Sequence, residues 1–378
     1  MKYGQKDMEG EMYMKRSVAV LGGGNGGHTL AADLSLAGHE VRLFEMEKFS
    51  HAMKHVFATK RIECLGEVLK GIAEITMVTS DIDQALKGAE IILVAVPAFA
   101  HKDYANLLAD KVNSDQLVVL LPGTLGSLEF VRIWNELGVN RDVVLAESDT
   151  LPYATRLEGP GKVRINVKIN VQIGVFPSIR TEWATALLAD ILSITPVSNV
   201  LEAGLSSMNP IDHPPGTILN AGRIERSNGQ FYIYEEGMTP SVIRVMEQLD
   251  QERLEIGKWF GLKLMTIAEL LHTSGYGPKG TTWEVLNGSR SLTPIKGPTS
   301  LQSRYLSEDI PFGLQTFASI ADHIGLDTPV MDSMITLGEI LVGGTPQSGR
   351  TIQTLGLGKL SKEEIMDFVR TGTPKVSV

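Results

Sequence analysis

Cysteine is nearly absent from the sequence. Cys64 is the only one among 378 residues, so no disulfide bond can form within the chain. Long apolar runs are also missing, because the longest, residues 91–100, is about half of the ~20 residues that cross a bilayer. Residues 1–15 are polar and lack the apolar segment of a secretory signal. We therefore expect a cytoplasmic protein with no membrane partner.

Positive charge is scarce as well. Lysine and arginine number 35 against 44 acidic residues, and no basic stripe accompanies the net charge of −9. Nucleic-acid binding depends on such a stripe, so we expect no nucleic-acid partner. No metal site is expected either. With 43% hydrophobic residues, the chain can form two domains, each with a core of ordinary size.

A βαβ unit is predicted near the start of the chain. Residues 17–21 are a short apolar run, residues 29–37 have helical spacing, and residues 40–44 form a second strand. Further strands are predicted at 74–78, 91–96, 117–121 and 143–146, with helical stretches at 81–86 and 104–112. This alternation predicts an α/β Rossmann domain with a doubly wound, mostly parallel sheet. Residues 166–176 alternate instead like one antiparallel strand.

Beyond about residue 200, helical patterns replace strand patterns. A long amphipathic helix is predicted over 242–256, and Pro240 is well placed before its start. Shorter helices are predicted over 320–324 and 331–341. Residues 273–303 are rich in glycine, serine, threonine and proline and are predicted to form long loops.

These patterns divide the chain into three parts. We predict a loose N-terminal extension over 1–15, a Rossmann dinucleotide-binding domain over 16–199, and an all-α substrate and catalytic domain over 200–378. The helices of the last part could also pair in a homodimer.

A glycine-rich turn follows the first strand. Residues 22–27 read GGGNGG and contain the G-x-G-x-x-G spacing at Gly22, Gly24 and Gly27. The first glycine permits a tight turn, the second lets a pyrophosphate approach the backbone, and the third lets helix and strand pack closely. The helix that starts near Asn25 would point free N–H groups at the phosphates. A glycine-rich surface turn is the alternative, but the flanking strand and helix favour a dinucleotide site.

The choice of cofactor depends on Glu45. This residue comes directly after the second strand, and 21 residues after Gly24. An acid there accepts hydrogen bonds from the ribose hydroxyls and repels the 2′-phosphate of NADP. No arginine adjoins it, so NAD is the expected cofactor and NADP is less favoured. Val96 and Pro97 end the fourth strand, where they could contact the nicotinamide half or simply close a buried strand.

Histidine is the usual proton partner of hydride transfer, because its pKa lies near neutral pH. Among the eight histidines, His213 stands apart because Pro210, Pro214 and Pro215 surround it. The prolines predict a rigid, irregular turn that presents one side chain. From the residues alone, an exposed histidine in a rigid loop fits this stretch equally well.

Three stretches of the second half carry a further signal. They are NPIDHPPGTILNAGRIE at 209–225, YEEGMTPSV at 234–242 and QSRYLSEDIPFGL at 302–314. Together they resemble the opine dehydrogenase family, which includes the octopine, nopaline and N-carboxyalkyl amino acid dehydrogenases. The resemblance runs from Ser17 to about Leu357, but the loops between residues 273 and 300 match no single member, which leaves the amino substrate open.

The resemblance implies a catalytic pair, His213 and Asp309, and an arginine that holds a substrate carboxylate, Arg304. Asn209 and Asn220 are expected to bind substrate as well. Physical chemistry agrees, because a carboxylate can orient an imidazole and a guanidinium matches a carboxylate with two hydrogen bonds, although surface ion pairs are the alternative. The implied reaction is the NADH-dependent reductive condensation of an α-keto acid with an amino acid through an imine, together with its reverse.

Two other functions stay open at this point. Hydroxy-acid, glycerol-3-phosphate and ketopantoate dehydrogenases share such a two-domain architecture but use a lysine as proton donor. Lys168 is the candidate, although its strand position also fits a solvent-facing side chain. A protein that senses NAD without turnover is the other alternative, and the stretches around His213 and Arg304–Asp309 argue against it.

Overall fold

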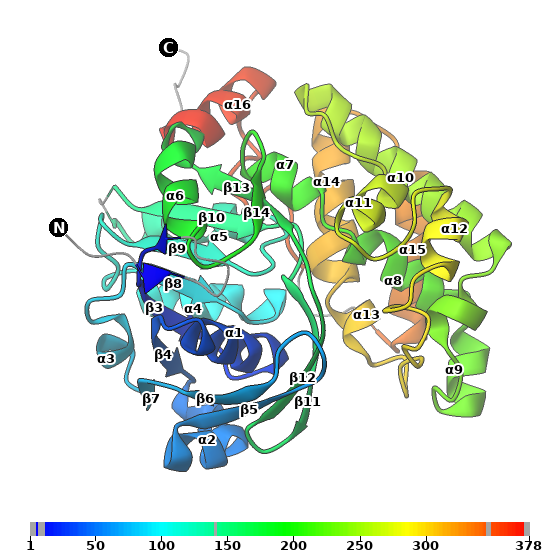
Figure 1. Cartoon of the computed structure of the whole chain (residues 1–378). Helices are drawn as coiled ribbons and strands as arrows, with labels where there is room; N and C mark the ends of the chain where they lie inside the picture. Colours follow the sequence, from blue (N-terminus) through cyan, green and yellow to red (C-terminus); the bar gives the residue numbers. More distant parts are fainter. Residues whose placement is uncertain (1–4, 7–11, 140–141, 345–348, 374–378) are drawn as a thin grey trace. The chain divides into compact units, whose positions relative to one another are not determined.

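The computed structural model describes residues 5–6, 12–139, 142–344 and 349–373. Its contacts divide the chain into two compact units. The first comprises Met1–Gly123 and Ile133–Val200, and the second comprises Thr124–Arg132 and Leu201–Val378 (Figure 1). The break after Val200 adjoins the predicted boundary, whereas the short segment Thr124–Arg132 falls in the second unit.

The first unit is built on a large sheet, which has eight strands among the described residues. All neighbouring strands in it are parallel except one antiparallel pair, β10 with β13. This confirms the predicted Rossmann domain with a mostly parallel sheet. In spatial order the strands are β14 (Ile194–Pro196), β13 (Val171–Phe176), β10 (Val144–Ser148), β9 (Leu117–Leu120), β8 (Ile91–Val94), β3 (Ser17–Leu21), β4 (Glu40–Phe44) and β7 (Met77–Thr79).

The middle strands are apolar throughout because helices cover both faces of the sheet. Every residue of β8 and β9 is fully buried, and Val18 pairs in register with Ile91. The helices of this unit are α1 (Asn25–Leu36), α2 (Lys54–Thr59), α3 (Ile82–Leu86), α4 (His101–Leu108) and α6 (Thr181–Leu188), whereas α5 (Gly126–Glu136) passes from the second unit into the first.

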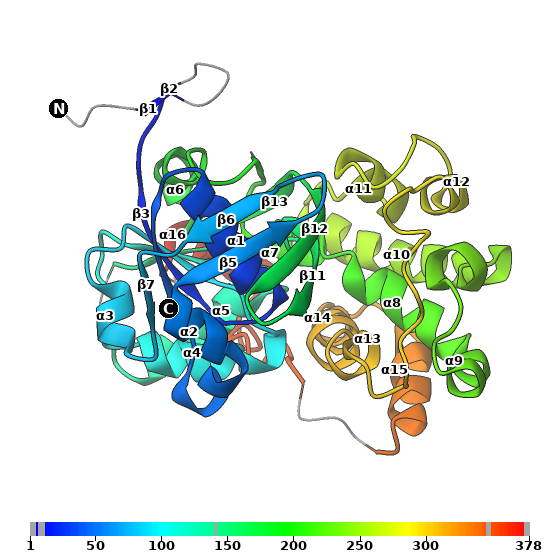
Figure 2. The ribbon, with the colours of Figure 1, turned by 60° about the horizontal axis from the view of Figure 1, so that its bottom comes forward.

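A smaller second sheet lies over α1, and the sequence did not predict it. Its spatial order is β11 (Tyr153–Gly159), β12 (Lys162–Lys168), β5 (Arg61–Leu65) and β6 (Gly71–Glu74) (Figure 2). Two predicted strands are therefore wrong as single elements. The run 74–78 is divided between β6 and β7, and the run 166–176 between β12 and β13, because in each case the chain passes from one sheet to the other. Short segments β1 (Gln5–Lys6) and β2 (Met12–Tyr13) pair within the predicted extension, most of which lies outside the described residues.

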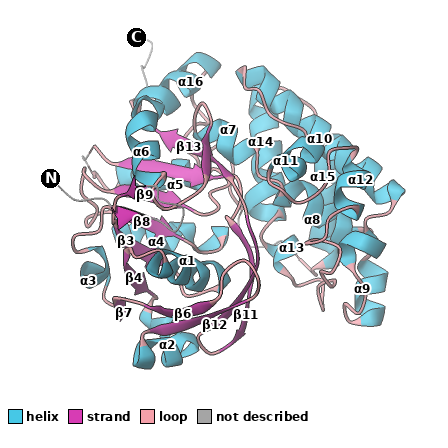
Figure 3. Ribbon diagram, in the orientation of Figure 1, coloured by secondary structure: helices cyan, strands magenta, loops and turns pink. Residues whose placement is uncertain are grey.

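The second unit is helical in the residues that the structure describes (Figure 3), with an isolated bridge between Tyr232 and Lys296. This confirms the predicted all-α second part. Its helices are α7 (Val200–Leu205), α8 (Asn209–Ile218), α9 (Ala221–Ser227), α10 (Pro240–Phe260), α11 (Ile267–Thr273), α12 (Thr282–Asn287), α13 (Arg304–Ser307), α14 (Gln315–Ile324), α15 (Pro329–Leu341) and α16 (Lys362–Thr371), together with two short π-helices, η4 (Ile233–Gly237) and η5 (Ile310–Leu314).

Helix α10 begins at Pro240, two residues before the predicted start, and is closed after Phe260 by Gly261, whose φ of 78° suits glycine. None of the described helices is long and apolar enough to cross a membrane. The predicted loop region 273–303 is only partly correct, because Thr281 caps α12 within it by a reciprocal capping box with Glu284.

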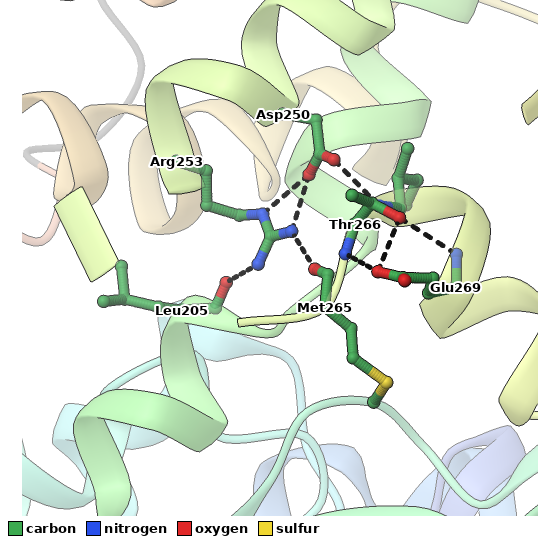
Figure 4. Close-up of polar contacts among 7 residues, drawn as sticks. Leu205, Asp250, Arg253, Met265, Thr266 and Glu269 are labelled. Carbon is green, nitrogen blue, oxygen red and sulfur yellow. Dashed lines mark hydrogen bonds and ion pairs between the residues drawn. The ribbon is translucent and has the colours of Figure 1, made fainter. Parts of the chain in front are cut away.

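A buried ion pair anchors α10 to its neighbours. The guanidinium of Arg253, which is 1% exposed, donates to Asp250 and to the carbonyl oxygens of Leu205 and Met265 (Figure 4). The other oxygen of Asp250 accepts the backbone N–H of Ile267 at 2.8 Å, at the start of α11. Because each charge is paired and hydrogen-bonded, the pair can stay in the core without a large desolvation cost.

A second buried ion pair ties the segment Thr124–Arg132 into the helical unit. Arg350 is 1% exposed, and its guanidinium lies 2.8 Å from the Glu129 carboxylate and 2.6 Å from the carbonyl oxygen of Thr124. The backbone of Thr124 and Leu125 has positive φ, 47° and 66°, which is unfavourable for side chains of these types. The hydrogen bond from Arg350 helps to hold this unusual turn.

Candidate active site

The glycine turn between β3 and α1 is shaped for close backbone approach. Gly22 has a φ of 107°, and a Cβ there would lie 2.6 Å from Cγ1 of Val96. A Cβ on Gly27 would lie 1.7 Å from the carbonyl oxygen of Gly22, so only glycine lets α1 start directly over β3. By contrast, a Cβ on Gly24 would meet nothing within 4 Å. This open space above the helix N-terminus can accept a pyrophosphate.

Glu45 lies just after β4, with its carboxylate held by the backbone. One oxygen accepts the N–H of Gly23 at 2.7 Å, the other accepts the N–H of Met46 at 2.7 Å, and the Tyr104 hydroxyl lies 3.4 Å away. Oε1 already accepts two hydrogen bonds, from Met46 and Tyr104, whereas Oε2 accepts one and can take another. The side chain is thus fixed beside the glycine turn with capacity left for a ribose hydroxyl, and these residues fit a dinucleotide.

The remaining residues predicted to touch the cofactor lie in the same unit. Val96 packs against the glycine turn, and Pro97 immediately precedes the 3-10 turn η2 (Ala98–Ala100). Asn25 is the first residue of α1, and its side-chain oxygen accepts the backbone N–H of Leu157 at 2.9 Å. Asn25 therefore also links the glycine turn to β11.

Asp149 is a buried carboxyl group that the sequence analysis did not single out. It directly follows β10 and is 1% exposed, and its Oδ1 accepts the backbone N–H groups of Thr150 at 2.9 Å and Gln172 at 3.0 Å. Burial raises the pKa of Asp149 to about 7, against the opposing effect of these hydrogen bonds. No local sequence pattern marks this residue, because its burial depends on β13, which is distant in the chain.

His213 lies within helix α8, so the predicted irregular turn is wrong. The helix has Pro210 in its first turn, where a missing N–H costs nothing, and it continues through Pro214 and Pro215. Those two residues cannot donate to the carbonyls of Pro210 and Ile211, which weakens the helix at that point. Packing of α8 against α10, α13, α15, η4 and η5 compensates for the lost hydrogen bonds.

The imidazole of His213 is paired with a carboxylate from a distant part of the chain. Its Nδ1 lies 2.8 Å from Oδ2 of Asp309, which precedes η5, and only 14% and 12% of the two side chains are exposed. The ring of Tyr305 stacks on it, with 3.8 Å between ring centroids. Gly313 allows η5 to approach α8 closely, because a Cβ there would lie 2.3 Å from Cγ of Pro210. The pair leaves Nε2 as the nitrogen that can exchange a proton with another group.

A second carboxylate lies beside the same imidazole, and the sequence analysis missed it. Oδ1 of Asp212 is 3.7 Å from Nε2 of His213, and Oδ2 accepts a hydrogen bond of 3.2 Å from the hydroxyl of Tyr234. Burial lowers the pKa of His213, but the charges of Asp212 and Asp309 outweigh it, so the net shift is upward. Burial raises the pKa of Asp212 to about 6.

Arg304 starts α13, one residue before the stacked Tyr305. Its Nε donates to Glu308 one turn later, and 59% of the Arg304 side chain is exposed. Asn209 starts α8 one turn before His213. The Asn220 amide donates to the carbonyls of Gly216 at 2.9 Å and Gly237 at 3.1 Å, which gives it a role in packing. Substrate binding by these three residues stays a prediction.

Lys168, the alternative proton donor, is engaged elsewhere. Its ammonium lies 2.7 Å from the carboxylate of Asp33 on α1, and the hydroxyl of Tyr153 donates to the same carboxylate oxygen at 2.5 Å. This ion pair joins the second sheet to α1. Lys168 therefore has a structural explanation within the first unit.

The first unit is a Rossmann domain whose glycine turn is shaped for a dinucleotide. The second is a helical unit of the same chain that carries a His–Asp pair. Together they define a two-domain NAD(P)-dependent oxidoreductase. Residues 17–126 match the family model described as the N-terminus of NAD-dependent glycerol-3-phosphate dehydrogenase. Residues 196–342 match the model described as the α-helical domain of NAD/NADP octopine/nopaline dehydrogenase.

Similar proteins narrow this class further. The chain is 34% identical over 362 residues to the opine dehydrogenase of Arthrobacter sp. (strain 1C), covering 95% of this chain and all of that protein. It is 26% identical to the vitopine synthase of Allorhizobium ampelinum, over 93% of this chain and 98% of that one. A solved octopine dehydrogenase with NADH and L-arginine has a TM-score of 0.72 and 20% identity, with 96% and 100% of the chains covered. The chain belongs to the opine dehydrogenase family.

Proposed function

We propose that the protein catalyses the NADH-dependent reductive condensation of an α-keto acid with the amino group of an amino acid, and the reverse oxidation of the secondary amine product. The observation that carries this proposal is the His213–Asp309 pair in the helical unit of a chain that belongs to this family. The first unit would bind the cofactor, and residues 200–378 would bind and protonate the substrates.

The cofactor would be held by the glycine turn and by the end of the large sheet. Gly22, Gly24 and Gly27 would admit the pyrophosphate to the N-terminus of α1, and Glu45 would accept hydrogen bonds from the adenosine ribose. Asn25, Val96 and Pro97 would complete the contacts. NADH supplies the hydride when it is bound. NAD is preferred over NADP because the fixed carboxylate of Glu45 repels a 2′-phosphate.

The helical unit would supply the proton. An imine becomes an amine when its carbon receives a hydride and its nitrogen a proton, and Nε2 of His213 would donate that proton. Asp309 would hold Nδ1–H, so that the ring keeps one orientation and its cationic form is stabilised. In the oxidative direction the neutral ring would take the proton back.

The guanidinium of Arg304 would bind a carboxylate of the substrates. Its Nε is engaged with Glu308, whereas the side chain is largely exposed, so its terminal nitrogens can form a forked contact with a carboxylate. Asn209, on the first turn of α8, and Asn220, just beyond its last turn, would contribute to substrate binding as well.

A turnover assay with NADH, pyruvate and a panel of amino acids tests this function. We expect NADH oxidation that depends on both substrates, with a secondary amine dicarboxylate as product by mass spectrometry. His213→Ala is the matched inactive variant. NADH oxidation with keto acid alone, yielding the hydroxy acid, would instead favour the hydroxy-acid dehydrogenase alternative. Binding of NADH without turnover of any pair would favour a sensor.

A further inference from the structure

Asp212 occupies an unusual position for a carboxylate. The residue is 4% exposed, and its neighbour on α8 is His213. Tyr234 donates to Oδ2, whereas Oδ1 is buried and has no hydrogen-bond partner among the residues that the structure describes. Nε2 of His213 lies 3.7 Å from this oxygen.

A buried carboxylate oxygen without a hydrogen bond is costly, because it has lost its water and gained nothing in exchange. A positive charge within ~4 Å offsets much of that cost. The imidazole of His213 supplies such a charge only when both of its nitrogens carry protons. The burial of Asp212 therefore favours the doubly protonated ring, just as the hydrogen bond from Nδ1 to Asp309 does on the other side.

We propose that Asp212 is a positioning residue that, together with Asp309, holds His213 in its protonated form before the imine is reduced. This inference rests on the proposed function and adds a residue to it. When the imine carbon receives a hydride and its nitrogen takes the proton from Nε2, the C=N bond becomes a C–N single bond and His213 becomes neutral. Both carboxylates keep their charges, and a proton from solvent restores the imidazolium.

Among the described residues, the groups that face His213 predict the sign of the change in its pKa. Asp212 and Asp309 favour the imidazolium, and Arg304 opposes it. Tyr305 stacks on the ring, and Tyr234, beside Asp212 and near Tyr276, has its pKa raised far above the working range by burial, so it stays neutral. Removing the charge of Asp212 leaves one carboxylate against one guanidinium. The pKa of His213 should therefore fall.

Asp212→Asn tests the proposal, because it keeps the shape of the side chain and a hydrogen-bond acceptor for Tyr234. In the reductive direction, where His213 must be protonated, the alkaline limb of kcat/KM should move down by about one pH unit or more. In the oxidative direction, where His213 must be neutral, the acidic limb should move down by the same amount. The variant should thus lose reduction at high pH and gain oxidation at low pH relative to the natural protein.

Glu252→Gln is the matched control. Glu252 is a partly buried acid of the same unit that accepts the N–H groups of Val330 and Met331 at the start of α15. Removing the charge of Glu252 should leave both the alkaline limb of the reductive pH profile and the acidic limb of the oxidative one in place. A uniform loss of activity in Asp212→Asn, with both limbs unmoved, would show that Asp212 only supports the helix and would overturn the proposal.

Two further measurements keep the proposal testable. The pKa of His213 can be read directly by NMR titration of the cofactor-free protein, where the resonance is the one that His213→Ala removes. A lower value in Asp212→Asn supports the proposal even if the substrate is not an imine, and an unchanged value refutes it. If Asp212→Asn does not fold, Tyr234→Phe removes the hydrogen bond to Oδ2, so Asp212 gains a proton more easily. The pKa of His213 should then fall by less than in Asp212→Asn, and an unchanged pKa would count against the proposal.

Discussion

Replacing Asp309 with asparagine is the most direct test of the acid–base pair. The amide side chain would have almost the same shape but no charge, so it would lose the attraction between the carboxylate and the imidazolium across 2.8 Å. At an effective dielectric constant of about 20, that attraction is worth about 6 kcal/mol. We take about half of it to be recovered by the amide dipole and by entering water, so turnover should fall by about 10²–10³-fold.

The assay is the initial rate of NADH oxidation at saturating substrates, with NADH binding measured separately by fluorescence. Binding of NADH should change little, because the residues proposed to hold it lie in the first unit. His213→Ala should lower turnover by about 10²–10⁴-fold, the usual contribution of a positioned proton donor. The double variant should be little worse than His213→Ala, since two residues that act as one unit lose activity non-additively.

Two results would refute this reasoning. If the losses from His213→Ala and Asp309→Asn multiply in the double variant, the residues act independently and do not form a dyad. If His213→Ala keeps near-normal turnover, the proton comes from another group, and Lys168 would be the next residue to replace.

Three further predictions concern the cofactor, the substrate and stability. Glu45→Gln should narrow the difference between the dissociation constants for NADH and NADPH, and an unchanged ratio would exclude Glu45 as the discriminating group. Arg304→Lys keeps the charge but loses the fork, so KM for the keto acid should rise more than KM for NADH; equal changes would indicate a structural role. Asp149 has a folded pKa of about 7, above its unfolded value of about 3.9, so its contribution to stability is complete below pH ~4 and is lost as pH rises through 7. Asp149→Asn should therefore raise Tm at pH 8 but not at pH 4, and a lower Tm at pH 8 would contradict the assignment.

The parts that could be predicted from sequence depend on patterns within short stretches of chain. The turn at Gly22–Gly27 and the acid at Glu45 are separated by one helix and one strand, and each has a local physical reason. The second sheet could not be predicted in this way. Its strands β5 and β6 are short, and their partner β12 lies about a hundred residues later in the chain, so no periodicity reveals the pairing.

The candidate site also depends on residues that are distant in the chain, which local patterns cannot bring together. His213 and Asp309 are 96 residues apart, and only a resemblance to known proteins joined them before the structure did. The prolines around His213 predicted a turn by their local preference, but tertiary packing kept α8 helical. Asp212 carries no signal at all in the sequence, because an acid next to a histidine on a helix is usually exposed, and its role follows from burial.

The ion pair between Arg350 and Glu129 has a practical consequence for anyone who wishes to study the helical unit by itself. The polypeptide passes between the two units three times, at Gly123, Arg132 and Val200, so a gene cut near residue 200 does not separate them. A fragment that begins at Leu201 keeps the cation and loses both its carboxylate and the carbonyl of Thr124. Removing one partner of a buried ion pair costs ~3–5 kcal/mol, a large part of the ~5–15 kcal/mol that stabilises a folded domain. Such a fragment should fold poorly until a peptide covering residues 124–132 is added or is fused to it.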